Sequence, residues 1–204
     1  MTEGVLSYVA LGDSYTIGTS VEPGESWPEQ LVAHLGPVPP TLELVANLGV
    51  NGYTSRDILD HELPQLDSLR PEFVSLLVGV NDVVQRVTAG AYRGSAALIL
   101  DTLLDRLTAD RIVTVETPDY TVTPHGASYG DPSEQSASVA RNNGILEELA
   151  LERGMRHVGG IFGLSRGAAD DRSLVADDGL HPSGRQYALW VELIAPVIDE
   201  LLGR

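Results

Sequence analysis

The chain of 204 residues contains no cysteine, and its 13 basic residues are all arginine, so lysine is absent as well. Without cysteine the protein has no thiol nucleophile, no disulfide and no cysteine-bound zinc. Without lysine it has no Schiff-base lysine, no phosphate-loop lysine and no Ser–Lys dyad. Covalent catalysis by this chain would therefore have to use Ser, Thr, Asp, Glu, His or Tyr.

Positive charge is also scarce, because 29 acidic residues against 13 basic ones give a formal net charge of -16. A surface this negative repels nucleic-acid phosphates and anionic lipids, so we expect neither a nucleic-acid nor a membrane partner. The first apolar run, Val5–Leu11, is too short to span a bilayer, and no targeting segment is visible. These features predict a cytoplasmic protein, and they do not indicate an oligomeric state.

Two kinds of apolar pattern alternate along the chain. Short, nearly continuous runs predict buried strands at Leu6–Leu11, Leu42–Asn47, Phe73–Val78, Ile112–Glu116 and Met155–Val158. Apolar residues at helical spacing predict helices around Trp27–Leu35, Leu100–Leu107, Ile145–Leu149 and Trp190–Leu201. Such alternation predicts an α/β fold, with a parallel sheet of about five strands covered by helices on both faces. Because no repeat or linker interrupts the pattern, we expect one domain over residues 1–204, with its ligand at the carboxyl ends of the strands.

The triplet Gly12-Asp13-Ser14 directly follows the first predicted strand. It would place the Ser14 hydroxyl at the carboxyl edge of the sheet, near a helix N-terminus where backbone N–H groups favour a tetrahedral oxyanion. Taken alone, the triplet is more typical of a plain helix cap.

The segment Asp178-Gly179-Leu180-His181-Pro182 offers a base for such a serine. A serine hydroxyl attacks only when a base removes its proton, and imidazole has a pKa suited to that task. A carboxylate three residues earlier, on a glycine-containing loop, can reach the other ring nitrogen and fix the tautomer. An exposed loop histidine beside an acid is an equally common interpretation of this segment.

Two further segments could supply oxyanion donors. Gly52 follows the second predicted strand, and its lack of a Cβ would let its N–H approach a substrate oxygen closely. Asn81 follows the third strand, and its amide could donate to the same oxygen. Ordinary turns also favour Gly and Asn, so each position alone is ambiguous.

The joint placement of these segments is more specific than any one of them. From Gly12 to Pro182, in this order, they resemble the GDSL-type lipases and esterases, also called SGNH hydrolases. The resemblance implies a flavodoxin-like three-layer α/β/α sandwich. It also makes Ser14, Gly52, Asn81 and His181 the four signature residues, with Asp178 completing the triad.

This chain departs from the family pattern at two places. Tyr15 stands where the family name has Leu, and Asn51 precedes Gly52 where many members have Ser. Neither change removes a nucleophile or a donor, so we expect altered pocket shape and intact catalysis. Asp13 is expected to support the turn.

The expected function is hydrolysis of carboxylic esters with small to medium acyl groups, through an acyl-enzyme on Ser14. His181 would act as general base oriented by Asp178, with the N–H groups of Ser14 and Gly52 and the Asn81 side chain as oxyanion hole. The partner would be a small-molecule ester, and no metal or organic cofactor is needed. Acyl transfer and thioester cleavage would use the same residues, and a non-catalytic binding domain of the same fold is a further alternative. A metallohydrolase is disfavoured because no third ligand clusters with the Asp178 and His181 pair.

The longest irregular stretch, Thr117–Pro132, is expected to wall the site or to be mobile. Within it, the run Gly126–Gly130 matches the Gly-x-Ser-x-Gly elbow of another hydrolase fold. That elbow requires a preceding strand and a following helix, and neither is evident, so we interpret the run as loop. Residues next to the motifs are expected to line the substrate pocket: Tyr15, Tyr53, Val83, Tyr120, His125 and Leu180.

Overall fold

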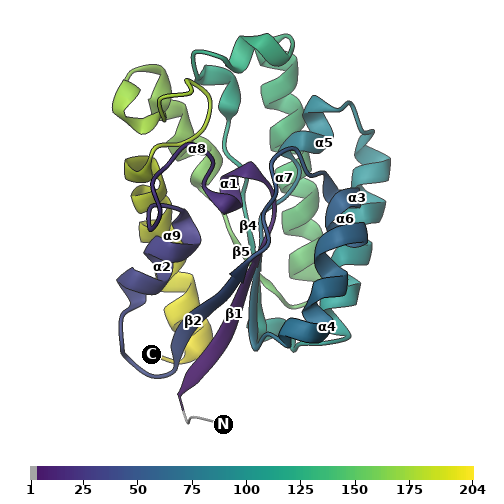
Figure 1. Cartoon of the computed structure of the whole chain (residues 1–204). Coiled ribbons are helices and arrows are strands. Elements are labelled where there is room, and N and C mark those ends of the chain that lie inside the picture. Colours follow the sequence, from purple (N-terminus) through teal and green to yellow (C-terminus); the bar gives the residue numbers. More distant parts are fainter. Residues whose placement is uncertain (1–3) are drawn as a thin grey trace.

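A parallel sheet between two layers of helices forms the centre of the computed structural model, which describes residues 4–204 (Figure 1). Its strands are β1 (Val5–Leu11), β2 (Thr41–Asn47), β3 (Phe73–Leu76), β4 (Ile112–Val115) and β5 (Arg156–Val158). They pair in parallel in the order β2-β1-β3-β4-β5. The predicted three-layer α/β/α fold is confirmed, and each strand overlaps the apolar run that predicted it. Residues 1–3 of the expected domain lie outside the described residues.

The four helical stripes correspond to the four longest helices of the described chain. These are α2 (Trp27–Leu35), α6 (Ala89–Leu104), α7 (Pro132–Glu152) and α9 (Gly184–Leu202). Leu107 of the second stripe lies beyond the end of α6. Three of these helices are capped at their N-termini by a side-chain oxygen that accepts a backbone N–H from the first turn. The capping residues are Thr88 for α6, Asp131 for α7 and Ser183 for α9.

Shorter helical segments connect the strands to these long helices. The short α-helices are α1 (Ser14–Ile17), α3 (Ser55–Asp57), α4 (Leu66–Leu69), α5 (Val80–Val84) and α8 (Ile161–Ser165). A π-helical turn, η1 (Ile58–Glu62), continues α3 and ends at a buried glutamate. Among residues 4–204, no helix is both long and apolar enough to cross a membrane.

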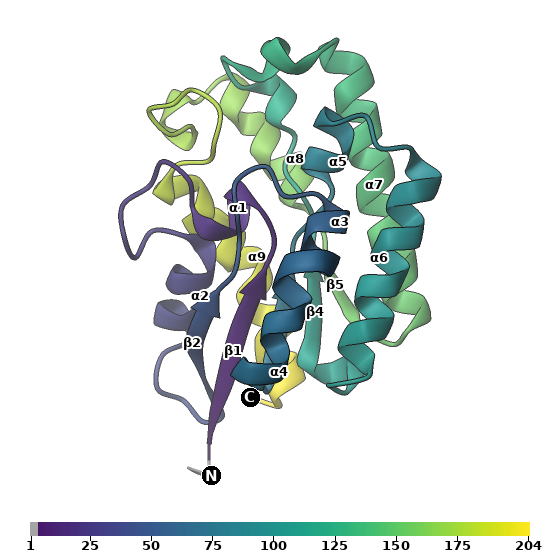
Figure 2. The ribbon, with the colours of Figure 1, turned by 45° about the vertical axis from the view of Figure 1, so that its right-hand side comes forward.

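Alternating side chains of β1 explain the two apolar layers. Tyr8 and Ala10 face α2 and α9, whereas Val9 and Leu11 face α6 and α7. Successive strand residues point to opposite sides of a sheet, so a strand covered on both sides must be apolar throughout. Figure 2 shows α6 and α7 side by side over one face, with α2 and α9 over the other.

The long segment Thr117–Pro132 contains two 3-10 turns, η4 (Tyr120–Val122) and η5 (Gly126–Tyr129). The Gly-Ala-Ser-Tyr-Gly run therefore lies on a 3-10 turn that follows another turn, without a leading strand. Ser128 is solvent-exposed. The interpretation of this run as loop is consistent with this geometry.

Candidate active site

Ser14 is the first residue of α1, directly beyond the carboxyl end of β1 (Figure 1). Gly12 makes the sharp turn possible, since a Cβ there would lie 2.6 Å from the carbonyl oxygen of Leu77. Asp13 caps the helix by accepting the N–H of Tyr15 at 3.0 Å. The predicted cap therefore exists and is made by Asp13, so the Ser14 side chain is left for another role. Ser14 is 7% exposed.

His181 lies on the loop that leads into α9 and is held by its own neighbour Asp178. The Nδ1 atom of His181 is 2.6 Å from Oδ2 of Asp178. The other carboxylate oxygen accepts the backbone N–H groups of Leu180 at 2.8 Å and His181 at 2.9 Å. Gly179, with φ of 72°, allows the tight turn between them. This is the local arrangement that the Asp178–His181 spacing predicts.

The pKa of Asp178 lies well below its ordinary value. Partial burial alone would raise it, but hydrogen bonds from His181, from the backbone N–H of Leu180 and from the Ser20 hydroxyl outweigh that effect. A carboxylate that stays ionised stabilises an imidazolium beside it. The rings of His181 and Tyr15 pack in a T-shaped arrangement, with their centroids 5.6 Å apart.

A cavity of about 300 Å³ joins the four separate segments at the carboxyl edge of the sheet. The sequence-predicted residues that line it are Ser14, Tyr15, Gly52, Asn81, Tyr120, Leu180 and His181. The other lining residues are Asn51, Val80, Val84, Gln85 and Tyr129. Ser14 and His181, which are far apart in sequence, thus face one cavity.

Gly52 and Asn81 both line the cavity, and their contacts differ in detail from the expectation. At Gly52 a Cβ would meet no atom within 4 Å, but its φ is 83°, so the backbone conformation favours glycine there. The side-chain amide of Asn81 donates to the Tyr53 carbonyl at 3.0 Å and, more weakly, to Asp13 Oδ2 at 3.3 Å. Gln85 donates to the Gly52 carbonyl at 2.8 Å and thereby holds the same turn.

Three of the expected pocket residues do not line the cavity. The Tyr53 ring lies against His61, with centroids 5.7 Å apart, and only its carbonyl is engaged by Asn81. Val83 points from α5 into the apolar core. His125 is exposed and packs over Gly179, whose carbonyl accepts its backbone N–H at 3.0 Å. These residues are near the motifs in sequence, but helix rotation and loop folding turn their side chains elsewhere.

Beneath the turn that carries Ser14 lie three fully buried carboxyl groups, on Asp13, Glu62 and Asp82. Glu62 Oε2 accepts the Gly12 N–H at 3.0 Å, while its Oε1 has no hydrogen-bond partner in the described chain. Desolvation raises the pKa of Glu62 to about 9 and that of Asp13 to about 7. It also raises the pKa of Asp82, although Ser55 donates two hydrogen bonds to that carboxyl.

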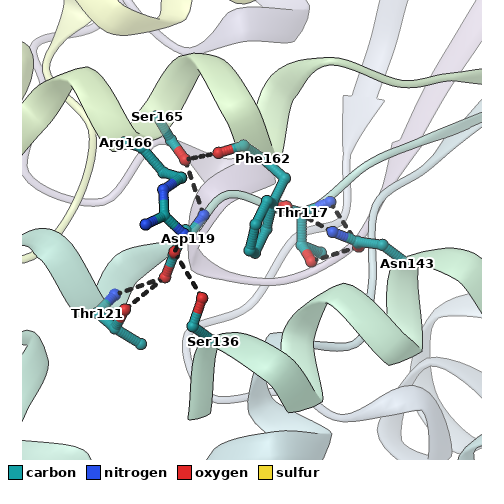
Figure 3. Close-up of polar contacts among 8 residues, drawn as sticks. All are labelled: Thr117, Asp119, Thr121, Ser136, Asn143, Phe162, Ser165 and Arg166. Carbon is teal, nitrogen blue, oxygen red and sulfur yellow. Dashed lines mark hydrogen bonds and ion pairs between the residues drawn. The ribbon is translucent and has the colours of Figure 1, made fainter. Parts of the chain in front are cut away.

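One wall of the cavity comes from the long loop, through Tyr120 and Tyr129. Figure 3 shows the buried Asp119 that anchors this loop to α7 and α8. Its carboxylate accepts the Thr121 N–H and hydroxyl, the Ser136 hydroxyl at 2.8 Å and an Arg166 N–H at 3.1 Å. The loop thus walls the site, as expected, and it is tied down by a buried polar cluster.

Sequence reasoning missed several residues at the site. Tyr129 could have been found, because it lies in the loop that was expected to wall the pocket. Gln85 and Ser20 lie outside every motif, so their contacts with Gly52 and Asp178 depend entirely on the tertiary structure. Within residues 4–204, no group of three or more His, Cys, Asp or Glu side chains is arranged to hold a metal ion.

Solved structures share this fold at low sequence identity. A lipase/acylhydrolase from Enterococcus faecalis is 20% identical with a TM-score of 0.74, covering 96% of each chain. TesA is 18% identical with a TM-score of 0.73, covering 96% of this chain and 99% of its own. Axe2, an acetylxylan esterase from Geobacillus stearothermophilus, is 18% identical with a TM-score of 0.71, covering 100% and 97%.

Sequence comparison identifies the family directly. Among curated proteins, no sequence matches this chain significantly. The model of the GDSL-like lipase/acylhydrolase family matches residues 10–189, a range that contains Ser14, Gly52, Asn81, Asp178 and His181. The predicted family and the prediction that the protein is an enzyme are thereby confirmed: this chain is a hydrolase of the GDSL-like lipase/acylhydrolase family.

Proposed function

We propose that the protein hydrolyses carboxylic esters through an acyl-enzyme on Ser14, in one catalytic domain formed by the whole chain. The observation that carries the proposal is the shared cavity of Ser14 and His181, with Nδ1 of His181 held by Asp178. Because Nδ1 is engaged, Nε2 is the ring nitrogen available to take the Ser14 proton. The cytoplasmic location stays a prediction of the sequence.

The proposed reaction begins when Ser14 attacks the ester carbonyl and His181 accepts its proton as general base. The protonated His181, stabilised by Asp178, then gives this proton to the departing alcohol, which leaves an ester between Ser14 and the acyl group. Water repeats the sequence: His181 takes a proton from it, the water oxygen attacks the acyl carbon, and the Ser14 oxygen leaves with the proton.

The backbone N–H groups of Ser14 and Gly52 support an oxyanion hole, since neither donates to an acceptor within residues 4–204. Asn81 would contribute the amide hydrogen that makes the longer contact with Asp13, while its bond to the Tyr53 carbonyl keeps the side chain in place. Donors fixed in this way lower the barrier because they need no reorganisation as charge develops.

The substrate proposal is an ester with a small to medium acyl group. A cavity of about 300 Å³ is at the lower end of the range for small-molecule sites. Tyr15, Tyr120, Tyr129 and Leu180 give it a largely aromatic and aliphatic wall, which suits an acyl chain. Val80 and Val84 extend this apolar lining from α5.

The test is turnover of an ester panel that varies in acyl length and alcohol, measured for the wild type and Ser14→Ala. Ser14→Ala should abolish turnover and labelling by a serine-directed phosphonate, while leaving the melting temperature within a few degrees. Ser128→Ala is the matched control, because this exposed serine stands in the other nucleophile-like sequence and should be dispensable.

Wild-type turnover by Ser14→Ala would refute the proposed nucleophile. Thioesters and candidate acceptor alcohols belong in the same panel, since thioester cleavage and acyl transfer would use the same residues. Exclusive product formation with an acceptor alcohol would replace hydrolysis by transfer. Failure of the wild type to be labelled would favour a binding domain.

A further inference from the structure

Ser20 joins the segment that carries Ser14 to the loop that carries His181. Its hydroxyl donates to Oδ2 of Asp178 at 2.7 Å, across 158 positions of sequence. The same oxygen is 2.6 Å from Nδ1 of His181. Ser20 itself is exposed and lies three residues after the end of α1, in the turn that follows Gly18. No motif in the sequence points to this residue.

The backbone of Ser20 has a positive φ of 67°, in the left-handed region. Among residues 4–204 only Arg70 and Arg86 share this feature without being glycine. A side chain in this conformation costs free energy that glycine would avoid. Strain of this kind persists where the surrounding structure holds it, and it is concentrated at functional sites. The hydroxyl contact with Asp178 is a specific reason to keep a serine in that turn.

We propose that Ser20 is a positioning residue for the catalytic acid: its hydroxyl fixes the Asp178 carboxylate so that Oδ2 meets His181 Nδ1 throughout the reaction. This inference rests on the proposed function. Two backbone N–H groups hold Oδ1 of Asp178, and Ser20 holds Oδ2, so rotation of the carboxylate group is blocked at both oxygens. Without Ser20 the oxygen facing His181 would be held by His181 alone.

The hydroxyl also favours the correct position of the proton. A hydrogen bond donated to Oδ2 lowers the affinity of that oxygen for a proton, because it already shares its negative charge. The proton that His181 takes from Ser14 therefore remains on the imidazole, from which it can be returned to the leaving alcohol. No bond to Ser20 forms or breaks in the cycle, so its role is exerted through Asp178.

Two substitutions separate this role from a merely structural one. Ser20→Ala removes the hydroxyl and keeps the strained backbone, whereas Ser20→Gly removes the hydroxyl and relieves the strain. Both should lower kcat about three- to tenfold, with KM within about twofold, because one exposed hydrogen bond to a charged group is lost in each. Ser20→Gly should have a higher melting temperature than Ser20→Ala, because glycine relieves the strained backbone and alanine does not.

Two control variants test the effects of backbone strain and of losing a serine hydroxyl separately. Arg70→Gly relieves a left-handed residue at the opposite end of the sheet, and it should raise stability without changing kcat. Ser173→Ala removes another serine hydroxyl that donates to a carboxylate, Asp171, and should leave kcat unchanged. Ser20→Asn should restore much of the lost kcat, since asparagine tolerates positive φ and its amide can donate to Asp178.

The outcomes distinguish this proposal from the function on which it rests. Wild-type kcat in Ser20→Gly, with Ser14→Ala inactive in the same assay, would overturn the role of Ser20 alone. A kcat that follows melting temperature, so that Ser20→Gly is clearly more active than Ser20→Ala, would also overturn it. Turnover by Ser14→Ala would overturn both proposals. The expected result is an equal loss of kcat in the two Ser20 variants, together with a higher melting temperature for Ser20→Gly than for Ser20→Ala.

Discussion

Asp178 and Glu62 are both acids close to the segment around Ser14, yet their surroundings shift their pKa values in opposite directions. Asp178 is partly exposed, with its side chain 30% accessible, and it accepts four hydrogen bonds from protein donors. Glu62 is fully buried and accepts one, from the Gly12 N–H. The pKa of Asp178 is lowered, whereas that of Glu62 is raised to about 9.

The difference shows that the number of donors, set against burial, decides which acid is charged at neutral pH. Asp178 has enough donors to stay ionised beside His181, which suits an orienting acid. Glu62 has too few, so it is protonated and supports the Gly12 turn as a neutral group. Elsewhere in the molecule, the buried Asp119 side chain accepts hydrogen bonds from Thr121, Ser136 and Arg166.

The largest effect on activity should come from removing the negative charge of Asp178, the more exposed of the two acids. Asp178→Asn keeps the shape of the side chain but cannot stabilise an imidazolium or enforce the same tautomer of His181. We expect kcat to fall by about 10³- to 10⁴-fold. Stability at neutral pH should fall as well, because the lowered pKa of Asp178 shows that its ionised form stabilises the folded protein. Steady-state kinetics at pH 8 measures the effect.

Asp177→Asn is the matched control for this experiment, because the neighbouring Asp177 is exposed and should tolerate the change. A fall of less than tenfold in Asp178→Asn would show that the ionised carboxylate is unimportant. That result would also remove the basis of the contrast with Glu62.

The buried Glu62 should affect how the stability of the protein depends on pH. Glu62 is protonated in the folded protein up to about pH 9 but loses its proton above its ordinary pKa of 4.5 when unfolded. Between these values unfolding releases a proton, so stability falls as pH rises, by about 1.4 kcal/mol per pH unit at most. Glu62→Gln retains an acceptor for Gly12 and cannot ionise, so its stability should fall less steeply. Urea unfolding at pH 5, 7 and 9 measures both slopes.

Glu43→Gln provides the control for that slope, since Glu43 is a solvent-exposed glutamate on β2. It should leave the wild-type pH dependence unchanged. Parallel slopes for the wild type and Glu62→Gln would mean that Glu62 is charged in the folded protein, in contradiction to the effect of its burial. Asp13, with a pKa raised to about 7, should account for part of the slope that remains.

The smallest effect should follow from removing only the cation beside Asp119. Arg166 is 55% exposed at its side chain, and Asp119 keeps its hydrogen bonds to Thr121 and Ser136 without it. Arg166→Gln should therefore reduce the free energy of unfolding by about 1 kcal/mol or less, and less still at high salt. Urea unfolding at two salt concentrations measures this change.

Arg172→Gln, at another exposed arginine, should have no measurable effect and serves as the control. A loss of several kcal/mol in Arg166→Gln would show that the hydroxyl and N–H donors cannot hold Asp119 by themselves. In that case Arg166, which directly follows α8, would be needed to hold the loop that places Tyr120 and Tyr129 at the cavity.

Much of the candidate site was predictable because its residues lie within a few positions of the carboxyl ends of strands. Ser14 follows β1, Gly52 comes soon after β2, and Asn81 follows β3, so parallel pairing brings them to one edge. Asp178 and His181 were predictable as a pair because three residues and one glycine suffice to close their turn. Tyr53 and Val83 were placed wrongly in the pocket because nearness in sequence does not determine where a side chain points.

The sequence by itself determined the sheet, its covering helices and the order of the four motif segments, since apolar periodicity and turn residues are local properties. Only the tertiary structure decided that Ser20 contacts Asp178 and that Glu62 lies beneath Gly12. Contacts between residues 158 and 50 positions apart depend on how packed elements meet, and no local pattern encodes that meeting. The same is true of the pKa shifts, because burial and donors are supplied by neighbours from elsewhere in the chain.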